Sequence, residues 1–188
     1  MDTGGVEYVH SLSSIDAVVP EGAIIVPQRV YTERPPLTGW QQKVVFPPGT
    51  NLKHAKDRSY VHHAEYKERV ATSNVDRLKF TLRLHWPGYA PWSCNIQARE
   101  RKEGAEPVQL AVLTERIAHA ISRFFEKERT EEHSGWSSEE RWDVQGTPPE
   151  TLTLLELRRV SEGSWQPVLC YSPSAGSTNV AHPFMPTL

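Results

Sequence analysis

Histidines gather in the first half of the chain, where several carboxylates lie near them in sequence. The residues are His54, His62, His63 and His85, with Asp57, Glu65 and Glu68. Three imidazoles, or two imidazoles and a carboxylate, can hold a divalent metal that keeps one coordination position open. However, adjacent residues such as His62 and His63 usually point in different directions, and the sequence contains no HExxH motif. We therefore expect solvent-exposed histidines and predict neither a metal ion nor another cofactor.

A polar cluster at the end of one expected strand is a candidate ligand site. Arg83 and His85 lie on the same side of that strand, and Tyr89 follows them in the turn "WPGY". A one-sided sheet with a helix can curl into a cone whose mouth holds a small molecule, and His62 or His63 would add an imidazole there. A nucleophile would need a base and an oxyanion site, yet the sequence contains no GxSxG, GxGxxG or phosphate-loop motif. We therefore name these five residues as ligand-binding candidates and assign no catalytic residue.

A basic face is expected around the same strand. Besides Arg83, its candidate residues are Lys79, Arg99, Arg101 and Arg158. Such a face could hold an acidic protein segment, a phosphate or single-stranded RNA, or it could be an ordinary solvated surface balanced by nearby glutamates. Sheets that bind RNA also present aromatic rings for base stacking. Because Phe80 and Trp86 are expected on the opposite face, nucleic acid is the weaker alternative.

Six tryptophans lie at the ends of expected elements or inside loops. A tryptophan has a large apolar body and one N–H donor, so it suits the margin of a core. It also suits an exposed anchor in a protein interface. Trp136 and Trp142 lie in a polar segment that has no other reason to bury anything, and they are the candidates for contact with a protein partner.

The two strongest structural patterns are a strand and a helix. Apolar and polar residues alternate over 78–86, which predicts a strand with one buried face, and residues 92–100 can return as its hairpin partner. Apolar residues at three- and four-residue steps predict an amphipathic helix over 108–128, with Pro107 at its first position.

Four shorter segments also read as strands: 23–26, 40–46, 151–160 and 165–172. The alternation slips between Leu154 and Leu155, which indicates a bulge or burial on both faces, and Pro167 favours an edge position or a bulge. A single helix and a sheet with one apolar face each need the other as a cover. We predict an α+β domain in which the helix packs on one face of an antiparallel sheet of about four to six strands.

Length and composition set further limits. The 188 residues carry a formal net charge of -2, which argues against a general attraction to nucleic acid or to an anionic membrane. They fit one domain over 21–172, with a weakly ordered segment over 1–20 and a flexible tail over 173–188. Cys94 and Cys170 are expected as free thiols, with a Cys94–Cys170 bridge as the alternative if their two strands are neighbours. With no apolar run that could span a bilayer and no signal-peptide pattern, we expect an intracellular protein of the cytoplasm or nucleus.

The layout "LRLHWPGYAPW", a helix, spaced tryptophans and a closing "SWQPVLCY" resembles uncharacterised small proteins of mushroom-forming fungi. The similarity spans roughly residues 78 to 171. It implies a single-domain fold and carries over no activity and no site residue.

Three functions follow as hypotheses. The leading one is a non-enzymatic intracellular module that binds a protein partner or a second copy of itself. The first alternative is a small-molecule enzyme or ligand-binding protein with its site near Arg83, His85 and Tyr89. The second alternative is single-stranded RNA binding on the basic face, and no membrane contact is expected.

Overall fold

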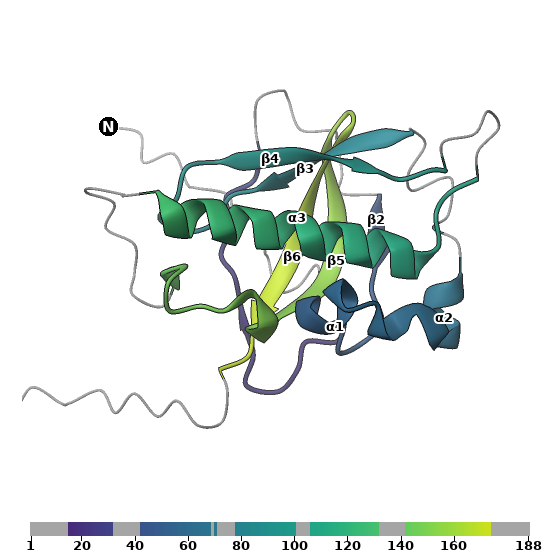
Figure 1. Ribbon diagram of the computed structural model, residues 1–188, viewed down its shortest axis with the longest axis horizontal. Coiled ribbons are helices and arrows are strands. Elements are labelled where there is room, and N and C mark those ends of the chain that lie inside the picture. The colour runs from purple at the N-terminus through teal and green to yellow at the C-terminus, as the bar shows by residue number, and fades with distance from the viewer. Residues whose placement is uncertain are drawn as a thin grey trace, which may run out of the picture.

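A computed structural model describes residues 15–31, 42–68, 70, 78–100, 106–131 and 142–173. The strands are β1 (Ile24–Ile25), β2 (Lys43–Val45), β3 (Lys79–Leu84), β4 (Trp92–Gln97), β5 (Leu152–Ser161) and β6 (Ser164–Tyr171). The helices are α1 (Leu52–Lys56), α2 (Ala64–Lys67) and α3 (Leu110–Thr130), with 3₁₀ turns η2 (Ser59–His62) and η4 (Pro149–Thr151). The α+β class is confirmed: α3 crosses one face of the sheet, and α1 and α2 lie beside it (Figure 1).

The expected hairpin forms from β3 and β4. The two strands pair antiparallel from Lys79↔Gln97 to Leu84↔Trp92. The alternation places Phe80, Leu82 and Leu84 in the core, as a period of two requires. The alternation also predicts Leu78 in the core. This is wrong, because Leu78 lies before the strand begins and is 47% exposed.

Within the described residues the sheet is mixed and has six strands: five follow the order β2-β5-β6-β3-β4, and β1 pairs with β6 off this path. The prediction of a wholly antiparallel sheet is therefore wrong at one place, where β3 and β6 run parallel through Thr81↔Ser164 and Leu82↔Trp165. β6 is the second strand of the antiparallel β5–β6 hairpin, and it lies between β5 and β3. Its direction is thus set by β5 and not by β3.

The slip at Leu154 and Leu155 corresponds to a bulge, and both faces of β5 are buried. The register between β5 and β6 shifts between Leu154 and Glu156. Because of this shift, Leu154 packs in the core beneath α3, whereas Leu155 joins a second apolar cluster with Val168 and Cys170. The sequence pattern indicated either a bulge or burial on both faces, and the structure shows both.

Residues 15–31 cover the sheet face that is opposite α3. Ile15, Ala17 and Val19 pack on the second apolar cluster. The Glu156 carboxylate accepts hydrogen bonds from the amides of Asp16 (2.6 Å) and Ala17 (3.1 Å). The expected weakly ordered segment over 1–20 and the tail over 173–188 stay predictions. The structure describes only 15–20 of the first and Pro173 of the second.

Gln28 fills a gap that opens between β3 and β6. Its side chain is fully buried, donates to the Pro167 carbonyl at 2.7 Å and accepts from the His85 amide at 3.2 Å. Pro167 was expected at an edge or a bulge, but it lies inside β6, which is a central strand. It is tolerated because no strand pairs with this part of β6 on the β3 side in the described chain.

The helix α3 begins and ends two residues later than the expected 108–128. Pro107 is not its first residue but forms an isolated bridge with Arg99. The Val108 amide donates to the Ala98 carbonyl, and the Val108 carbonyl accepts from the Val70 amide. These contacts hold the backbone before α3 in an extended conformation. None of the helices in the described ranges is long and apolar enough to cross a membrane.

Candidate functional site

Arg83 is the centre of the candidate site. It lies on the side of β3 that faces away from α3, next to Tyr31 from the N-terminal segment. Its guanidinium carbon lies 4.0 Å from the centroid of the Tyr31 ring, which is cation–π geometry. Its Nε is shielded from solvent and has no hydrogen-bond acceptor among the residues that the structure describes. Packing against Tyr31 therefore holds Arg83 in place, and its Nε–H group donates to no described protein atom.

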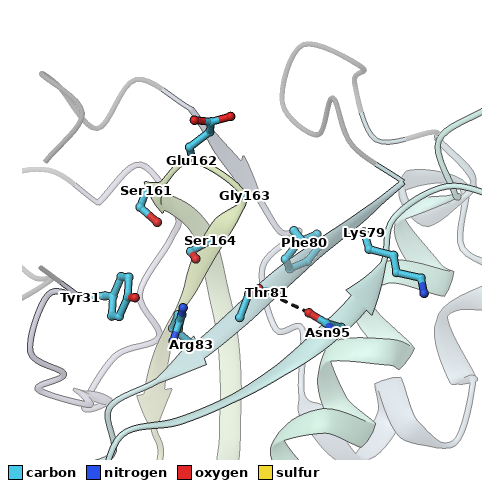
Figure 2. Close-up of a pocket in the computed structure, with 10 residues that line it drawn as sticks. All are labelled: Tyr31, Lys79, Phe80, Thr81, Arg83, Asn95, Ser161, Glu162, Gly163 and Ser164. Carbon is cyan, nitrogen blue, oxygen red and sulfur yellow. Dashed lines mark hydrogen bonds between the residues drawn. The ribbon is translucent and has the colours of Figure 1, made fainter. Parts of the chain in front are cut away.

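A cavity of about 330 Å³ opens beside this guanidinium. Its lining residues come from three places: the N-terminal segment, the β3–β4 hairpin and the turn between β5 and β6. They are Tyr31, Lys79, Phe80, Thr81, Arg83, Asn95, Ser161, Glu162, Gly163 and Ser164 (Figure 2). The cavity has about the volume of the smaller ligand pockets, roughly 300 Å³, and most of its side chains are polar.

Charges in the cavity are unevenly placed. Figure 2 shows the Ser161 and Ser164 hydroxyls and Tyr31 on one side of Arg83. Lys79 lies at the far end and points away from it, and the Glu162 carboxylate points outward from the turn (Figure 2). The inner part of the cavity therefore presents a guanidinium and neutral hydroxyls, which together suit an anionic group.

The tight turn between β5 and β6 shapes one wall. Gly163 has φ 77°, a left-handed conformation that glycine adopts without strain. Its carbonyl accepts the Thr81 amide at 2.8 Å, so the turn is attached to β3. This bond belongs to the short parallel contact between β3 and β6, and it holds Ser161 and Ser164 near Arg83.

His85 and Tyr89 do not line this cavity. The His85 ring meets Tyr31 edge-on at 6.0 Å. The Tyr89 hydroxyl donates to Asp143 at 3.2 Å and accepts from the Val144 amide at 3.2 Å. Burial raises the pKa of Tyr89, and the bond from Val144 opposes that rise. The prediction that Tyr89 joins Arg83 in one ligand site is therefore wrong for this cavity, because the Tyr89 ring and hydroxyl join the turn to neighbouring segments.

His62 and His63 lie in a different part of the molecule. Both are exposed, in and just after η2, which packs with α1 and α2 beside α3. The His63 ring meets Tyr60 and Tyr66 edge-on, and Tyr60 stacks on Tyr66 at 4.4 Å. The predicted grouping of these histidines with Arg83 is therefore wrong. Among the described residues, no three His, Cys, Asp or Glu side chains lie together in a way that could hold a metal ion.

The expected basic face is smaller than predicted. Lys79 is exposed and Arg83 half-buried, but Arg158 is only 2% exposed and donates to Glu156 at 2.7 and 2.8 Å. Arg158 is therefore a buried ion-pair partner, because residues 15–31 cover the face on which it lies. Arg99 bridges to Pro107 near the end of the hairpin, and Arg101 lies outside the described residues.

Trp142 is a core residue and not an exposed anchor. It is 2% exposed, and its carbonyl accepts the Trp86 indole N–H at 2.7 Å. The two indoles meet edge-on at 5.9 Å, and Trp86 also packs on Phe124 and Phe125 of α3. The polar segment thus buries Trp142 because it closes the core beside the "WPGY" turn. Trp136, the other predicted interaction residue, lies outside the described part of the chain.

Several lining residues had no signal as site residues in the sequence. Tyr31, Asn95, Ser161 and Ser164 are of common types, and nothing in their spacing relates them to Arg83. The turn "SEGS" was visible, but its position beside Arg83 depends on the parallel contact.

Comparison with known proteins adds no assignment to the site. The resemblance to small proteins of mushroom-forming fungi stays a prediction. No protein-family model, curated protein or solved structure matches this chain.

Proposed function

We propose that this protein is a non-enzymatic binding module whose Arg83 cavity receives the carboxylate or phosphate group of a ligand. The observation that carries the proposal is the shielded Arg83 Nε, which lacks an acceptor among the described residues and lies beside a cavity. Since solvent does not reach Nε, an anionic group in the cavity would compensate the positive charge of the half-buried guanidinium rather than accept a hydrogen bond from Nε itself.

The Tyr31 ring supports the proposal because it holds the guanidinium in place before a ligand arrives. Its centroid lies 4.0 Å from the guanidinium carbon. Arginine binds carboxylate and phosphate through the edge of its planar group, often with two parallel hydrogen bonds. Preorganisation of this kind lowers the entropy that binding would otherwise cost.

The lining favours binding over catalysis. The serine hydroxyls at 161 and 164 have no imidazole beside them in the cavity lining, and the Glu162 carboxylate points outward (Figure 2). A serine nucleophile needs a base within hydrogen-bond reach. The first alternative, a small-molecule enzyme, is therefore the weaker form of this proposal. Single-stranded RNA is weaker still, because Phe80 and Trp86 are buried and offer no ring for stacking.

Calorimetric titration with inorganic phosphate, and separately with acetate, tests the anion site. We expect saturable binding of at least one anion and a decrease in affinity of about tenfold or more in Arg83→Gln, because charge-assisted hydrogen bonds contribute about 1.5–3 kcal/mol. Arg83→Lys keeps the charge but loses the planar group and should also bind more weakly. Lys53→Gln is the matched control, since it removes one positive charge from an exposed residue of α1 that does not line the cavity. Equal binding by wild type and Arg83→Gln would exclude Arg83 as the anion site.

A further inference from the structure

The strand β4 forms one edge of the sheet, and part of that edge is open in the described chain. The Thr81 amide donates to Gly163, toward β6. Backbone groups alternate in direction along a strand, so Phe80 and Leu82 direct theirs toward β4. In the observed register, Ser93 and Asn95 of β4 then direct their amides and carbonyls away from β3.

The open stretch of β4 ends at its C-terminal residue. The Gln97 carbonyl accepts a hydrogen bond from the Arg116 guanidinium on α3. One residue later, the Ala98 amide donates to the Leu78 carbonyl on the β3 side, and the Ala98 carbonyl accepts the Val108 amide. The uncovered backbone is thus confined to the part of β4 around Ser93 and Asn95. An unpaired row of backbone donors and acceptors is a template for one more strand.

A groove of about 440 Å³ runs beside this edge, between β4 and α3. One stripe of α3 forms its wall, at helical steps of three and four residues. The lining residues are Lys56, Asn95, Ile96, Gln97, Arg116, His119, Ser122, Arg123 and Glu126. Three of these carry a fixed positive charge and one, Glu126, a negative charge, so the groove is basic. Glu115, another acidic residue of α3, is not among the lining residues; it pairs with Arg58 at 2.8 Å and lies 3.9 Å from His119.

Asn95 lines both the groove and the Arg83 cavity. The two hollows therefore meet at the open edge of β4. Side chains of an extended segment alternate between the two faces of a sheet. A strand added beside Asn95 would direct every second side chain toward the basic groove and the others toward the outer face.

We propose that the β4 edge binds an extended acidic segment of a partner protein as an additional strand. Main-chain hydrogen bonds to Ser93 and Asn95 would supply affinity, and carboxylates facing Lys56 and Arg123 would supply preference for acidic sequences. A second copy of this chain is a poorer occupant, since two β4 edges would bring two basic grooves together. This inference is independent of the anion site, because it depends on the backbone of β4 and on α3 rather than on Arg83.

Fluorescence anisotropy tests the proposal with a labelled peptide of six residues, the length of β4, in which glutamate and threonine alternate. A peptide with lysine in place of glutamate is the charge control. A peptide whose alternate amides are N-methylated is the backbone control. We expect saturable binding of the first peptide only, weakened by added salt because exposed charges are screened.

Asn95→Pro removes the amide that faces outward, at an edge position where proline is compatible with a strand. It should weaken peptide binding by about tenfold, as expected for a lost backbone hydrogen bond and a distorted edge. Asn95→Ala loses the same side chain, including its contact with Thr81 at 3.4 Å, and should bind almost as wild type does. Arg123→Glu should weaken binding and reduce its dependence on salt, whereas Arg83→Gln should not abolish it.

Any one of the following results would overturn the proposal. The first is equal affinity of Asn95→Pro and Asn95→Ala for the peptide, with both variants folded by circular dichroism. The second is equal binding of the glutamate and lysine peptides. The third is a wild-type dimer in light scattering that Asn95→Pro dissociates, which would assign the edge to a second copy. If Asn95→Pro does not fold, the N-methylated peptide tests the same hydrogen bonds, and its undiminished binding would overturn the proposal.

Discussion

Replacing Glu156 with glutamine should destabilise the fold strongly, although the side chain keeps almost the same shape. Glu156 is fully buried, and its carboxylate joins three parts of the chain. One oxygen accepts the amides of Asp16 and Ala17, and the other accepts two N–H groups of Arg158. The Lys43 ammonium lies 3.8 Å from the first oxygen. In Glu156→Gln, one of these oxygens becomes an NH₂ group that faces donors.

The magnitude follows from the contacts that are lost. Either orientation of the glutamine amide removes two hydrogen bonds and leaves Arg158, which is 2% exposed, without its carboxylate charge. Breaking one partner of a buried ion pair costs about 3–5 kcal/mol. That is a large part of the roughly 5–15 kcal/mol by which a native domain is stable.

Urea unfolding followed by tryptophan fluorescence measures this loss. With a slope of roughly 2–3 kcal/mol per M, the midpoint should fall by about 1–2 M. Hydrogen exchange distinguishes the two orientations of the glutamine amide, because the Asp16 and Ala17 amides lose their acceptor and exchange faster only if the new NH₂ group faces them. The double variant Glu156→Gln with Arg158→Met should be more stable than Glu156→Gln alone, since it removes a buried cation that has lost its carboxylate partner.

Two outcomes would refute this reasoning. If Glu156→Gln lowers the free energy of unfolding by less than about 1 kcal/mol, the buried pair is weak or is replaced by other contacts. No recovery in the double variant would show that the loss of stability does not come from removing the carboxylate charge beside Arg158.

Further predictions concern the core and its titrating groups. Trp86→Phe removes the donor to the Trp142 carbonyl and should lower the free energy of unfolding by at least about 1–3 kcal/mol, measured in urea; an unchanged midpoint would contradict this. Burial raises the pKa of Tyr66 from 10.0 to about 12, so the folded state holds this proton more tightly than the unfolded state does. The resulting stability is fully present below pH 10 and is lost as the pH rises toward 12; Tyr66→Phe should remove that part of the pH dependence in unfolding titrations. Burial also raises the pKa of Cys170 to about 11, so iodoacetamide should modify Cys170 only after unfolding, while half-buried Cys94 reacts slowly in the native protein, as followed by mass spectrometry.

Local patterns in the sequence were sufficient to predict the strand and the helix that each bury one face. The period of two over β3 and the helical spacing over α3 reflect side-chain directions that the backbone alone fixes. The slip at Leu154 and Leu155 was visible for the same reason, because two adjacent leucines cannot lie on one face of a regular strand. Helix ends were less accurate, since the start of α3 depends on contacts of Val108 with Val70 and Ala98.

The candidate site was predictable only in part. Arg83 was identifiable because it lies on the polar face of a clear strand. Its partners were not, because Tyr31 and the turn at 161–164 approach it through long-range contacts. Trp142 and Arg158 were misplaced for the same reason: the sequence does not reveal which segment covers a polar or aromatic side chain.

The sequence by itself determined the α+β class, the β3–β4 hairpin, the long helix and the bulge in β5, since each follows from the period of neighbouring side chains. Only the tertiary structure decided the parallel contact of β3 with β6, the covering of the second sheet face by residues 15–31 and the open edge of β4. These features depend on which distant segments share a surface. Burial and charge pairing over the whole chain decide which segments meet, so a local pattern of residues cannot predict it.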